Sequence, residues 1–177
     1  MNEQDRRTVS FLCTHNSARS QMAEGFLRHL AGERFEVHSA GVEATAVRPQ
    51  AIEVMCELGI DISGQESKTL ERYLGQPFGY VISVCDEAKE ACPVFPGAIR
   101  RLHWSLEDPA QATSSEEERL LVFRSVREEI VERIKRELRL LGIGAPSRDS
   151  GPVKQPPASG TNRNSESFPC VGDARDL

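Results

Sequence analysis

The sequence has no long apolar run. No stretch approaches the roughly 18 consecutive apolar residues of a membrane-spanning helix, and no short apolar core of a secretion signal stands near the N-terminus. The chain also has no excess of basic residues, because 22 Lys and Arg and 27 Asp and Glu give a net charge of −5. This balance argues against nucleic acid or an anionic membrane as the main partner. We therefore expect a soluble, cytoplasmic protein that acts as a monomer.

The cysteine pattern lacks the marks of a disulfide scaffold and of a zinc site. Without a secretion signal, the five cysteines, at positions 13, 56, 85, 92 and 170, do not indicate a secreted disulfide framework. Cys85 and Cys92 are separated by six residues, more than the about two to four of a zinc knuckle, and no pair of histidines follows. We expect no metal site, so catalysis, redox chemistry or burial must account for the thiols.

Predicted strands and helices alternate along the chain, and no internal repeat interrupts them. We place strands near 8–13, 33–41, 79–84 and 98–104, and helices at 19–31, 48–59, near 70–74 and from 115 onward. This alternation predicts a three-layer α/β domain, a four-stranded parallel sheet with helices on both faces, and a ligand site beyond the carboxyl ends of the strands. We assign 1–142 to this domain. The remaining 143–177, rich in Pro, Ser and Gly, are predicted to be a disordered tail.

The segment from Cys13 to Ser20 follows the first predicted strand and leads into a helix. At such a junction free backbone N–H groups and the helix dipole favour an anion, and favour a thiolate over a thiol. Arg19 offers a planar fork for two oxygens of a tetrahedral oxyanion, Asn16 tolerates a left-handed backbone, and Ser20 can donate to a sulfur anion. An inert buried thiol would leave these residues unexplained. We predict a Cys13 nucleophile at the base of an oxyanion-binding loop made of Thr14, His15, Asn16, Ser17, Ala18, Arg19 and Ser20.

Cys85 and Cys92 flank a short segment rich in Ala, Glu and Lys, which favour a helix. Seven residues of helical rise would place the two Cα atoms about 10 Å apart. A disulfide needs a separation of at most about 7 Å. The pair can therefore bond only if the segment unwinds, and its short, polar character with Pro93 after it leaves little packing to lose. The alternative is that the two are unrelated buried cysteines.

The sequence gives weaker signals about the roles of three other residues. Asp108 precedes Pro109 in a predicted loop, where its carboxyl group could donate a proton to a leaving oxygen, although Asp before Pro is also a common turn. Cys56 stands among apolar residues of a predicted helix and is expected to be a core thiol. Cys170 falls in the predicted tail and is expected to be exposed.

These motifs together resemble the thioredoxin-coupled arsenate reductases, a family that shares its fold and anion loop with the low-molecular-weight protein tyrosine phosphatases. The resemblance covers about 8–141 and leaves the tail out. It is carried by Cys13 to Arg19, Ser20-Gln21-Met22-Ala23-Glu24-Gly25, Ser39-Ala40-Gly41, Cys85 with Cys92-Pro93, His103-Trp104 and Asp108-Pro109. Two loop positions depart from the family pattern, because His15 stands where glycine is common and Ala18 where some members carry a further cysteine.

The resemblance implies a role for each candidate residue. Cys13 would attack the arsenic of bound arsenate, Arg19 and the loop amides would hold its oxygens, and Asp108 would protonate the departing hydroxyl. Cys85 would then attack the Cys13 sulfur and release arsenite. Cys92 would next attack Cys85, and unwinding would carry the Cys85–Cys92 disulfide to the surface for reduction by thioredoxin. No metal or organic redox cofactor is implied, and a mycothiol or glutathione system is an alternative reductant.

Some members of this family bind a potassium ion near the anion loop. Asn16, Glu24 and Ser39 stand at matching positions, whereas Lys68 stands at the position of the matching aspartate. An ammonium group there can replace the ion. We predict activity that is insensitive to potassium.

Two other function classes fit the same residues. A protein tyrosine phosphatase would use Cys13, Arg19 and Asp108 through a phosphocysteine, but that family usually has an aromatic residue after Asp-Pro, where this chain has Ala110, and it does not need Cys92. A non-catalytic anion-binding module would need the loop without a nucleophile or relay. The loop by itself does not separate phosphate from arsenate.

Overall fold

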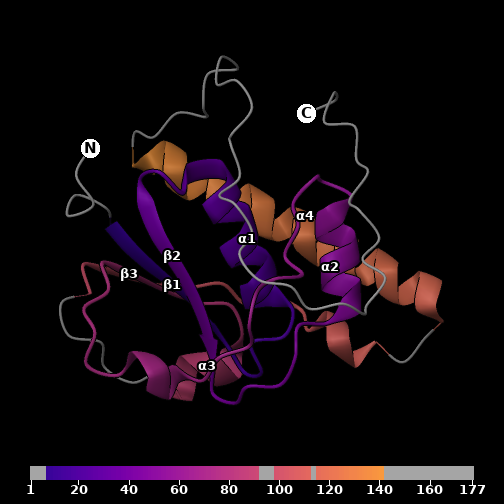
Figure 1. The fold of residues 1–177 in the computed structure, drawn as a ribbon, viewed down its shortest axis with the longest axis horizontal. Helices are drawn as coiled ribbons and strands as arrows, with labels where there is room; N and C mark the ends of the chain where they lie inside the picture. Colours follow the sequence, from indigo (N-terminus) through magenta and orange to yellow (C-terminus); the bar gives the residue numbers. More distant parts are fainter. Residues whose placement is uncertain (1–6, 92–97, 113–114, 142–177) are drawn as a thin grey trace, which may run out of the picture.

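The computed structural model describes residues 7–91, 98–112 and 115–141, and places ten elements along them. In chain order they are β1 (Arg7–Cys13), α1 (Arg19–Ala31), β2 (Phe35–Gly41), α2 (Pro49–Cys56), the 3-10 helix η2 (Leu70–Tyr73), β3 (Tyr80–Ser83), α3 (Asp86–Ala91), β4 (Arg100–His103), the 3-10 helix η3 (Pro109–Gln111) and α4 (Glu116–Leu140) (Figure 1). Cys92, Cys170 and the predicted tail at 143–177 lie outside the described residues.

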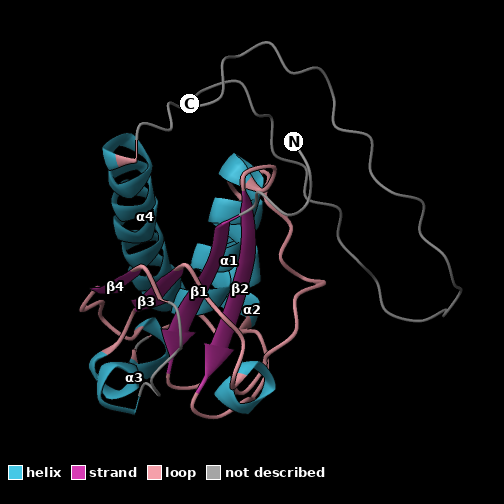
Figure 2. Ribbon diagram, turned by 90° about the vertical axis from the view of Figure 1, so that its left-hand side faces the viewer, coloured by secondary structure: helices cyan, strands magenta, loops and turns pink. Residues whose placement is uncertain are grey.

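The four strands form one parallel sheet in the order β2-β1-β3-β4, which confirms the predicted class. Its register aligns the last residues of neighbouring strands, because Cys13 pairs with Gly41 and Ser83 with His103. Figure 2 shows α3 beside the carboxyl ends of the strands. The end of the sheet where ligands bind in open α/β folds therefore carries the ends of β1 and β3 together with α3.

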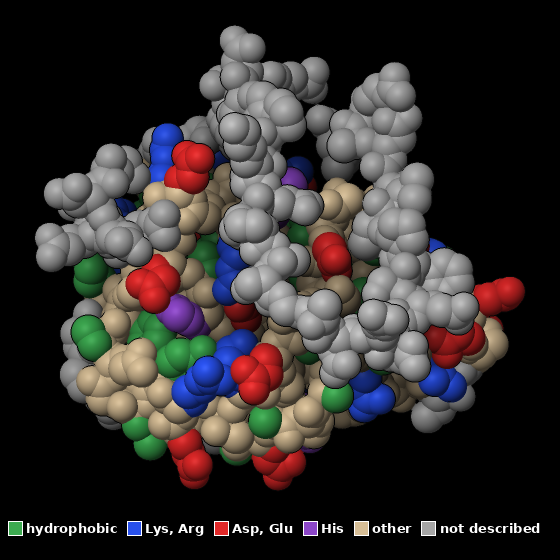
Figure 3. All heavy atoms as spheres, in the orientation of Figure 1, with side chains coloured by type: hydrophobic (Ala, Val, Ile, Leu, Met, Phe, Trp, Pro, Cys, Tyr) green, Lys and Arg blue, Asp and Glu red, His purple; other side chains and the backbone are tan. Residues whose placement is uncertain are grey.

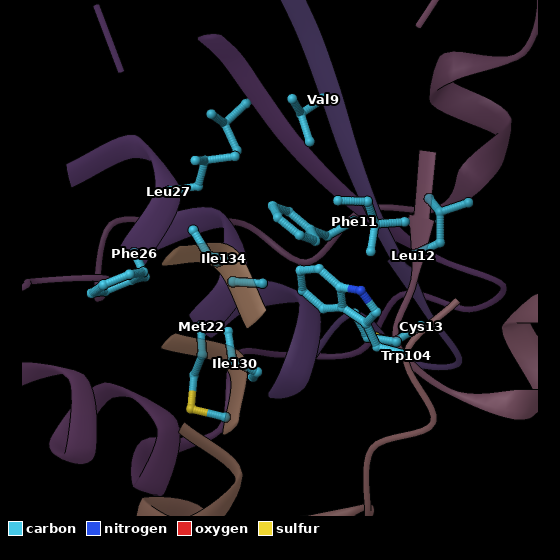
Figure 4. Close-up of a cluster of buried hydrophobic side chains, with 14 of the residues drawn as sticks. Val9, Phe11, Leu12, Cys13, Met22, Phe26, Leu27, Trp104, Ile130 and Ile134 are labelled. Carbon is cyan, nitrogen blue, oxygen red and sulfur yellow. The ribbon is translucent and has the colours of Figure 1, made fainter. Parts of the chain in front are cut away.

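The main core lies between the sheet and the helices α1 and α4. Val9 and Phe11 of β1 face Leu27 of α1 and Ile134 of α4, and all four side chains are buried (Figure 4). The ring of Trp104 packs on Phe11 with centroids 5.9 Å apart. This apolar contact fixes β1 from one side, and with it the residue at its end, Cys13.

The opposite face of the sheet is covered by η2 and the segment that follows it. Successive side chains of a strand alternate between faces, and the ring of His38 in β2 packs against Tyr73 at 5.3 Å and Phe78 at 5.7 Å between ring centroids. Covered faces on both sides explain why β3 is buried along its whole length.

Local signals account for most element boundaries. The Ser115 side chain accepts a hydrogen bond from the Glu118 N–H and caps α4, as the acidic run after Ser115 predicts. Gly59 has a φ of 73° just after α2, a backbone conformation that suits glycine. The predicted strand at 33–41 begins only at Phe35, because Arg34 still closes the turn after α1 by donating its N–H to Ala31 O.

The described surface is mixed in charge. In Figure 3, acidic and basic side chains lie interspersed on the part of the face that the described residues form. Among these residues, no helix is both long and apolar enough to cross a bilayer. Charge of one sign does not mark a site on this part of the face, so the core and the strand ends are the features that define the site.

Candidate active site

Cys13 is the last residue of β1, and its sulfur lies inside the loop that leads into α1. The side chain is 3% exposed. Its Sγ lies 2.8 Å from Ser20 Oγ and accepts a hydrogen bond of 3.1 Å from the Asn16 N–H. The predicted strand-to-helix junction thus exists, and it surrounds the sulfur with donors.

Asn16 holds the loop in shape. Its φ is 47°, the one left-handed non-glycine backbone among the residues described. Its side-chain NH2 donates to Ser20 Oγ and Ser39 Oγ, each at 2.8 Å. Its Oδ1 accepts from Gln21 Nε2 at 2.9 Å and from the Lys68 N–H at 2.7 Å. Because this fully buried amide uses both its donors and its acceptor, it ties α1, β2 and the segment before η2 to the loop.

The direction of these hydrogen bonds aims a proton at the sulfur. Ser20 Oγ accepts from Asn16, which leaves the Ser20 O–H free to donate to Cys13. Ser39 accepts from the same amide and donates to the Glu24 carboxylate. The network therefore presents Ser20 as a donor to a Cys13 thiolate.

Burial nevertheless raises the pKa of the Cys13 thiol above its ordinary value. The Ser20 hydrogen bond lowers this pKa, the proximity of Cys85 raises it, and the Arg19 guanidinium lowers it. Loss of water around the sulfur outweighs the stabilising groups. Burial therefore opposes the thiolate that the loop donors and the helix dipole favour, and the sequence-based expectation took no account of this burial.

Arg19 is the first residue of α1, and it is 6% exposed. Its Nη1 donates to Leu106 O at 3.0 Å, and its Nη2 lies 3.4 Å from Asp108 Oδ2. The loop that carries Asp108 thus reaches the anion loop, as the sequence predicted. Asp108 also accepts from the Ala110 N–H at 3.1 Å, so one carboxylate both caps η3 and faces Arg19.

Cys85 lies next to Thr14 of the loop. It is a free thiol, 1% exposed, in the link between β3 and α3. Its Sγ lies 3.3 Å from the hydroxyl of Thr14, which directly follows Cys13. The structure therefore brings together two free thiols that stand 72 positions apart in the chain.

The other predicted loop residues contribute in different ways. Ser17 and Ala18 are buried at the N-terminus of α1, where Ala18 is the N-cap. The His15 imidazole instead points outward, with 47% of its side chain exposed and its Nε2 at 3.9 Å from Glu43 Oε2. His15 joins the loop through its backbone, because His15 O accepts from the Ser67 hydroxyl at 3.1 Å.

A buried ion pair stands behind the loop. Lys68 Nζ lies 3.7 Å from Glu24 Oε2, with 10% and 4% of the two side chains exposed. Glu24 also accepts from Arg28 and from Ser39. An ammonium group therefore occupies the surroundings of the carboxylate on which the Asn16 network ends.

The remaining thiol of the described chain differs from its prediction. Cys56 is not a free core thiol, since it is half-buried at the end of α2 and is disulfide-bonded. The buried side of this helix is formed by Ala51, Val54 and Met55, which leaves position 56 at its margin. Among the described residues, no cluster of three or more His, Cys, Asp or Glu could hold a metal ion.

Two residues of the resemblance motifs, Gln21 and Gly41, support the loop in ways that the sequence did not predict. Gln21, fully buried, bridges Asn16 and Glu66 O with one amide nitrogen. Gly41 passes so close to the loop that a Cβ there would lie 2.7 Å from Asn16 N and 2.8 Å from Thr14 O. Neither role has a local signal in the sequence beyond the residue type, because both depend on contacts across chain segments.

Known proteins resemble this chain over its described core. The model of the family of low molecular weight phosphotyrosine protein phosphatases matches residues 8–142. An arsenate reductase of Halalkalibacterium halodurans is 46% identical over 131 residues, which cover 74% of this chain and 94% of that protein. A structure of an arsenate reductase in the oxidized state has a TM-score of 0.67 at 38% identity, with 76% of this chain and 98% of that one covered. A thioredoxin-dependent arsenate reductase of Corynebacterium glutamicum has a TM-score of 0.57 at 29% identity, with 79% and 65% covered.

Proposed function

The chain belongs to the low molecular weight phosphotyrosine protein phosphatase family and, within it, to the arsenate reductases, and on that premise we propose that it reduces arsenate to arsenite by a three-cysteine relay. The observation that carries the proposal is the second free thiol, Cys85, held at the hydroxyl of Thr14 in the oxyanion loop. Ester hydrolysis needs one nucleophile. Reduction of arsenic needs two electrons, which a second thiol supplies when it forms a disulfide.

The first step is exchange of an oxygen for sulfur. The Cys13 thiolate attacks arsenic, a sulfur–arsenic bond forms, and one oxygen leaves as water after taking a proton from Asp108. Arg19 and the backbone N–H groups of the loop hold the remaining oxygens. Because Asp108 lies 3.4 Å from Arg19 Nη2, the proton donor and the oxyanion-binding guanidinium face the same space.

The second step moves the electrons. The Cys85 thiolate attacks the Cys13 sulfur, the sulfur–arsenic bond breaks, and its electron pair stays on arsenic, which leaves as arsenite. The product on the protein is a Cys13–Cys85 disulfide. The contact between Thr14 and Cys85 holds the attacking sulfur at the loop before this step.

The third step frees Cys13 for another turnover. The Cys92 thiolate attacks the Cys85 sulfur and forms a Cys85–Cys92 disulfide, with Cys13 as the leaving thiolate. The described residues between these two cysteines are helical. A continuous helix would separate two residues seven positions apart by about 10 Å, so α3 must open before this disulfide can form. A dithiol of the thioredoxin class then reduces the disulfide, in the cytoplasm, where such reductants keep thiols reduced.

Steady-state turnover of arsenate tests the relay. The wild-type protein with thioredoxin, thioredoxin reductase and NADPH is expected to oxidise one NADPH per arsenite released, over many turnovers. Cys92→Ala is expected to release one arsenite per protein and stop, because the Cys13–Cys85 disulfide has no internal partner. Sustained turnover in that variant would refute the relay. Glutathione with glutaredoxin, or mycothiol, in place of thioredoxin identifies the reductant class.

A matched cysteine control separates the relay from a general effect of thiol loss. Cys170→Ala removes a cysteine with no assigned step and is expected to leave turnover unchanged. Cys13→Ser is expected to abolish arsenite formation while phosphate still binds. If Cys13→Ser retained the biological activity along with anion binding, a non-catalytic binding module would replace the enzyme.

Hydrolysis of phosphate esters is the second candidate, because Cys13, Arg19 and Asp108 are the parts it requires. Ala110, half-buried after Asp108-Pro109, offers no aromatic ring to pack on a phosphotyrosine. Turnover of p-nitrophenyl phosphate but not of arsenate would favour the phosphatase. Slow hydrolysis that needs Cys13 but not Cys85 or Cys92 would be a side activity of the shared loop.

A further inference from the structure

A chain of hydrogen bonds connects the end of the sheet with the first residue of α3. Ser83 Oγ lies 2.8 Å from His103 Nδ1, and His103 Nε2 lies 2.8 Å from Asp86 Oδ1. The Ser105 hydroxyl donates to the other carboxylate oxygen of Asp86 at 3.2 Å. Asp86 directly follows Cys85 in the chain, so these contacts end one residue from the second thiol of the proposed relay.

The positions of the hydrogens fix the direction of the hydrogen bond between His103 and Asp86. An ionised carboxylate only accepts, so His103 Nε2 carries the hydrogen that Asp86 receives. In neutral His103, Nδ1 then accepts from the Ser83 hydroxyl. In the imidazolium form Nδ1 donates to Ser83, whose own hydrogen can turn to Leu102 O at 3.4 Å. The link from His103 to Asp86 therefore persists in both protonation states.

The two ends of this link differ in how firmly they are held. His103 pairs with Ser83 in the sheet register, and the next residue, Trp104, donates its N–H to Ser83 O at 2.8 Å. The Asp86 side chain is 73% exposed, and it begins a helix of only six residues. A helix this short has little stability of its own. Its start is therefore fixed from the sheet, through His103.

We propose that His103 is a positioning residue for the relay: by holding Asp86 at the start of α3, it keeps the Cys85 sulfur at the Thr14 hydroxyl, on the side of Cys13. Ser105 supports it through the second carboxylate oxygen. The proposal deepens the proposed function and rests on it, because its consequence is the rate at which Cys85 attacks the Cys13 sulfur.

Two amide substitutions of His103 separate its two contacts. In His103→Gln the amide nitrogen reaches about as far as Nε2, so it can still donate to Asp86. In His103→Asn the amide reaches only about as far as Nδ1, so it can contact Ser83 but not Asp86. Loss of a hydrogen bond to a charged group is expected to change rates about tenfold, and only the Asn variant should show this change.

Two rates are measured in each variant. In a single turnover with arsenate, the Cys13–Cys85 disulfide should form about tenfold more slowly in His103→Asn. Alkylation of Cys85 by iodoacetamide, followed by peptide mass spectrometry, should become faster, because the thiol is 1% exposed when α3 is held. The affinity for inorganic phosphate should not change. A general loss of structure would weaken phosphate binding as well, so this combination identifies a positioning role.

Asp86→Ala provides a second variant with little packing to disturb, and it should reproduce both changes of His103→Asn. His38→Asn is the control, because it removes a histidine–carboxylate contact of 2.9 Å and two ring contacts from β2 but none with the described residues of α3, and should leave Cys85 alkylation unchanged. Equal rates for the Asn and Gln variants of His103, or wild-type rates in Asp86→Ala, would overturn the proposal. If the wild-type protein reduces no arsenate, the alkylation rates still decide whether His103 positions Cys85.

Discussion

The anion loop, from Cys13 to Ser20, and the helix α3 both lie at the carboxyl ends of the strands, but the protein holds them differently. Asn16 and Ser20 of the loop are fully buried, and hydrogen bonds reach Asn16 from α1, β2 and the segment before η2. The helix α3 has six residues and begins at Asp86, whose side chain is 73% exposed.

This difference matches what each region must do. An oxyanion is stabilised best by donors that are already in place, since moving them during the reaction would cost free energy. A relay that ends in a disulfide between Cys85 and Cys92 instead needs an element that opens at low cost. Variants in the two regions can therefore show whether the loop is rigid and whether α3 opens at low cost.

The largest effect is expected from Asn16→Ala. Alanine tolerates the φ of 47° poorly and leaves the partners of the Asn16 side chain without their hydrogen bonds. We expect kcat/KM for arsenate to fall about 100-fold or more, which corresponds to about 2.7 kcal/mol, together with a lower free energy of unfolding. Steady-state kinetics and urea unfolding measure the two. Gln76→Ala, at an exposed amide, is the control, and near wild-type kinetics in Asn16→Ala would show that the loop needs no such support.

A smaller effect is expected from Ser20→Ala on the Cys13 thiol. The pKa of Cys13 is already raised by burial, and the Ser20 hydrogen bond is the largest influence that lowers it. Without Ser20 the pKa should rise further, so the thiolate fraction at neutral pH should fall. The thiolate fraction grows as pH rises through the pKa, so the rate of Cys13 alkylation should climb at higher pH in the variant than in the wild type.

Ser63→Ala is a control for the Ser20 experiment. Ser63 is exposed, and its N–H and its side chain both hydrogen-bond the neighbouring Asp61. Its pH profile should match the wild type. A Ser20→Ala profile displaced to lower pH would contradict the assigned hydrogen-bond direction. The displacement also measures how far the loop's donors compensate for the burial of the sulfur.

Local sequence patterns predicted the parts of the site that lie close together in the chain. The strand before Cys13 and the helix from Arg19 follow from hydrophobic spacing, and the loop chemistry follows from its residue types. The raised pKa of Cys13 was missed because it depends on burial by elements far along the chain. Contacts of Asn16 with Ser39 and Lys68 join segments 23 and 52 residues away, a separation that no local pattern encodes. The resemblance to potassium-binding members of the family pointed to Asn16, Ser39 and Lys68. It assigned no role to Gln21 or Gly41.

Ala88→Gly tests whether α3 opens at low cost. Ala88 is fully buried within α3, and glycine in a helix costs about 1 kcal/mol relative to alanine. Amide hydrogen exchange of α3 should become about fivefold faster, while the affinity for phosphate stays the same. Ala51→Gly, at a fully buried position of α2, should leave α3 exchange unchanged. Weaker phosphate binding in Ala88→Gly would mean that loop and helix are one cooperative unit.

No effect at all is expected from potassium. The Lys68 ammonium lies 3.7 Å from the buried Glu24 carboxylate, and Arg28 contacts the same carboxylate. A monovalent cation would have to displace a tethered charge and gain little Coulomb energy, so activity should be equal in potassium and sodium salts at the same ionic strength. A potassium-dependent rate in the wild type would contradict this. Lys68→Ala should instead gain a dependence on potassium, because it removes one positive partner of the buried Glu24 carboxylate and opens the space that the Lys68 side chain fills.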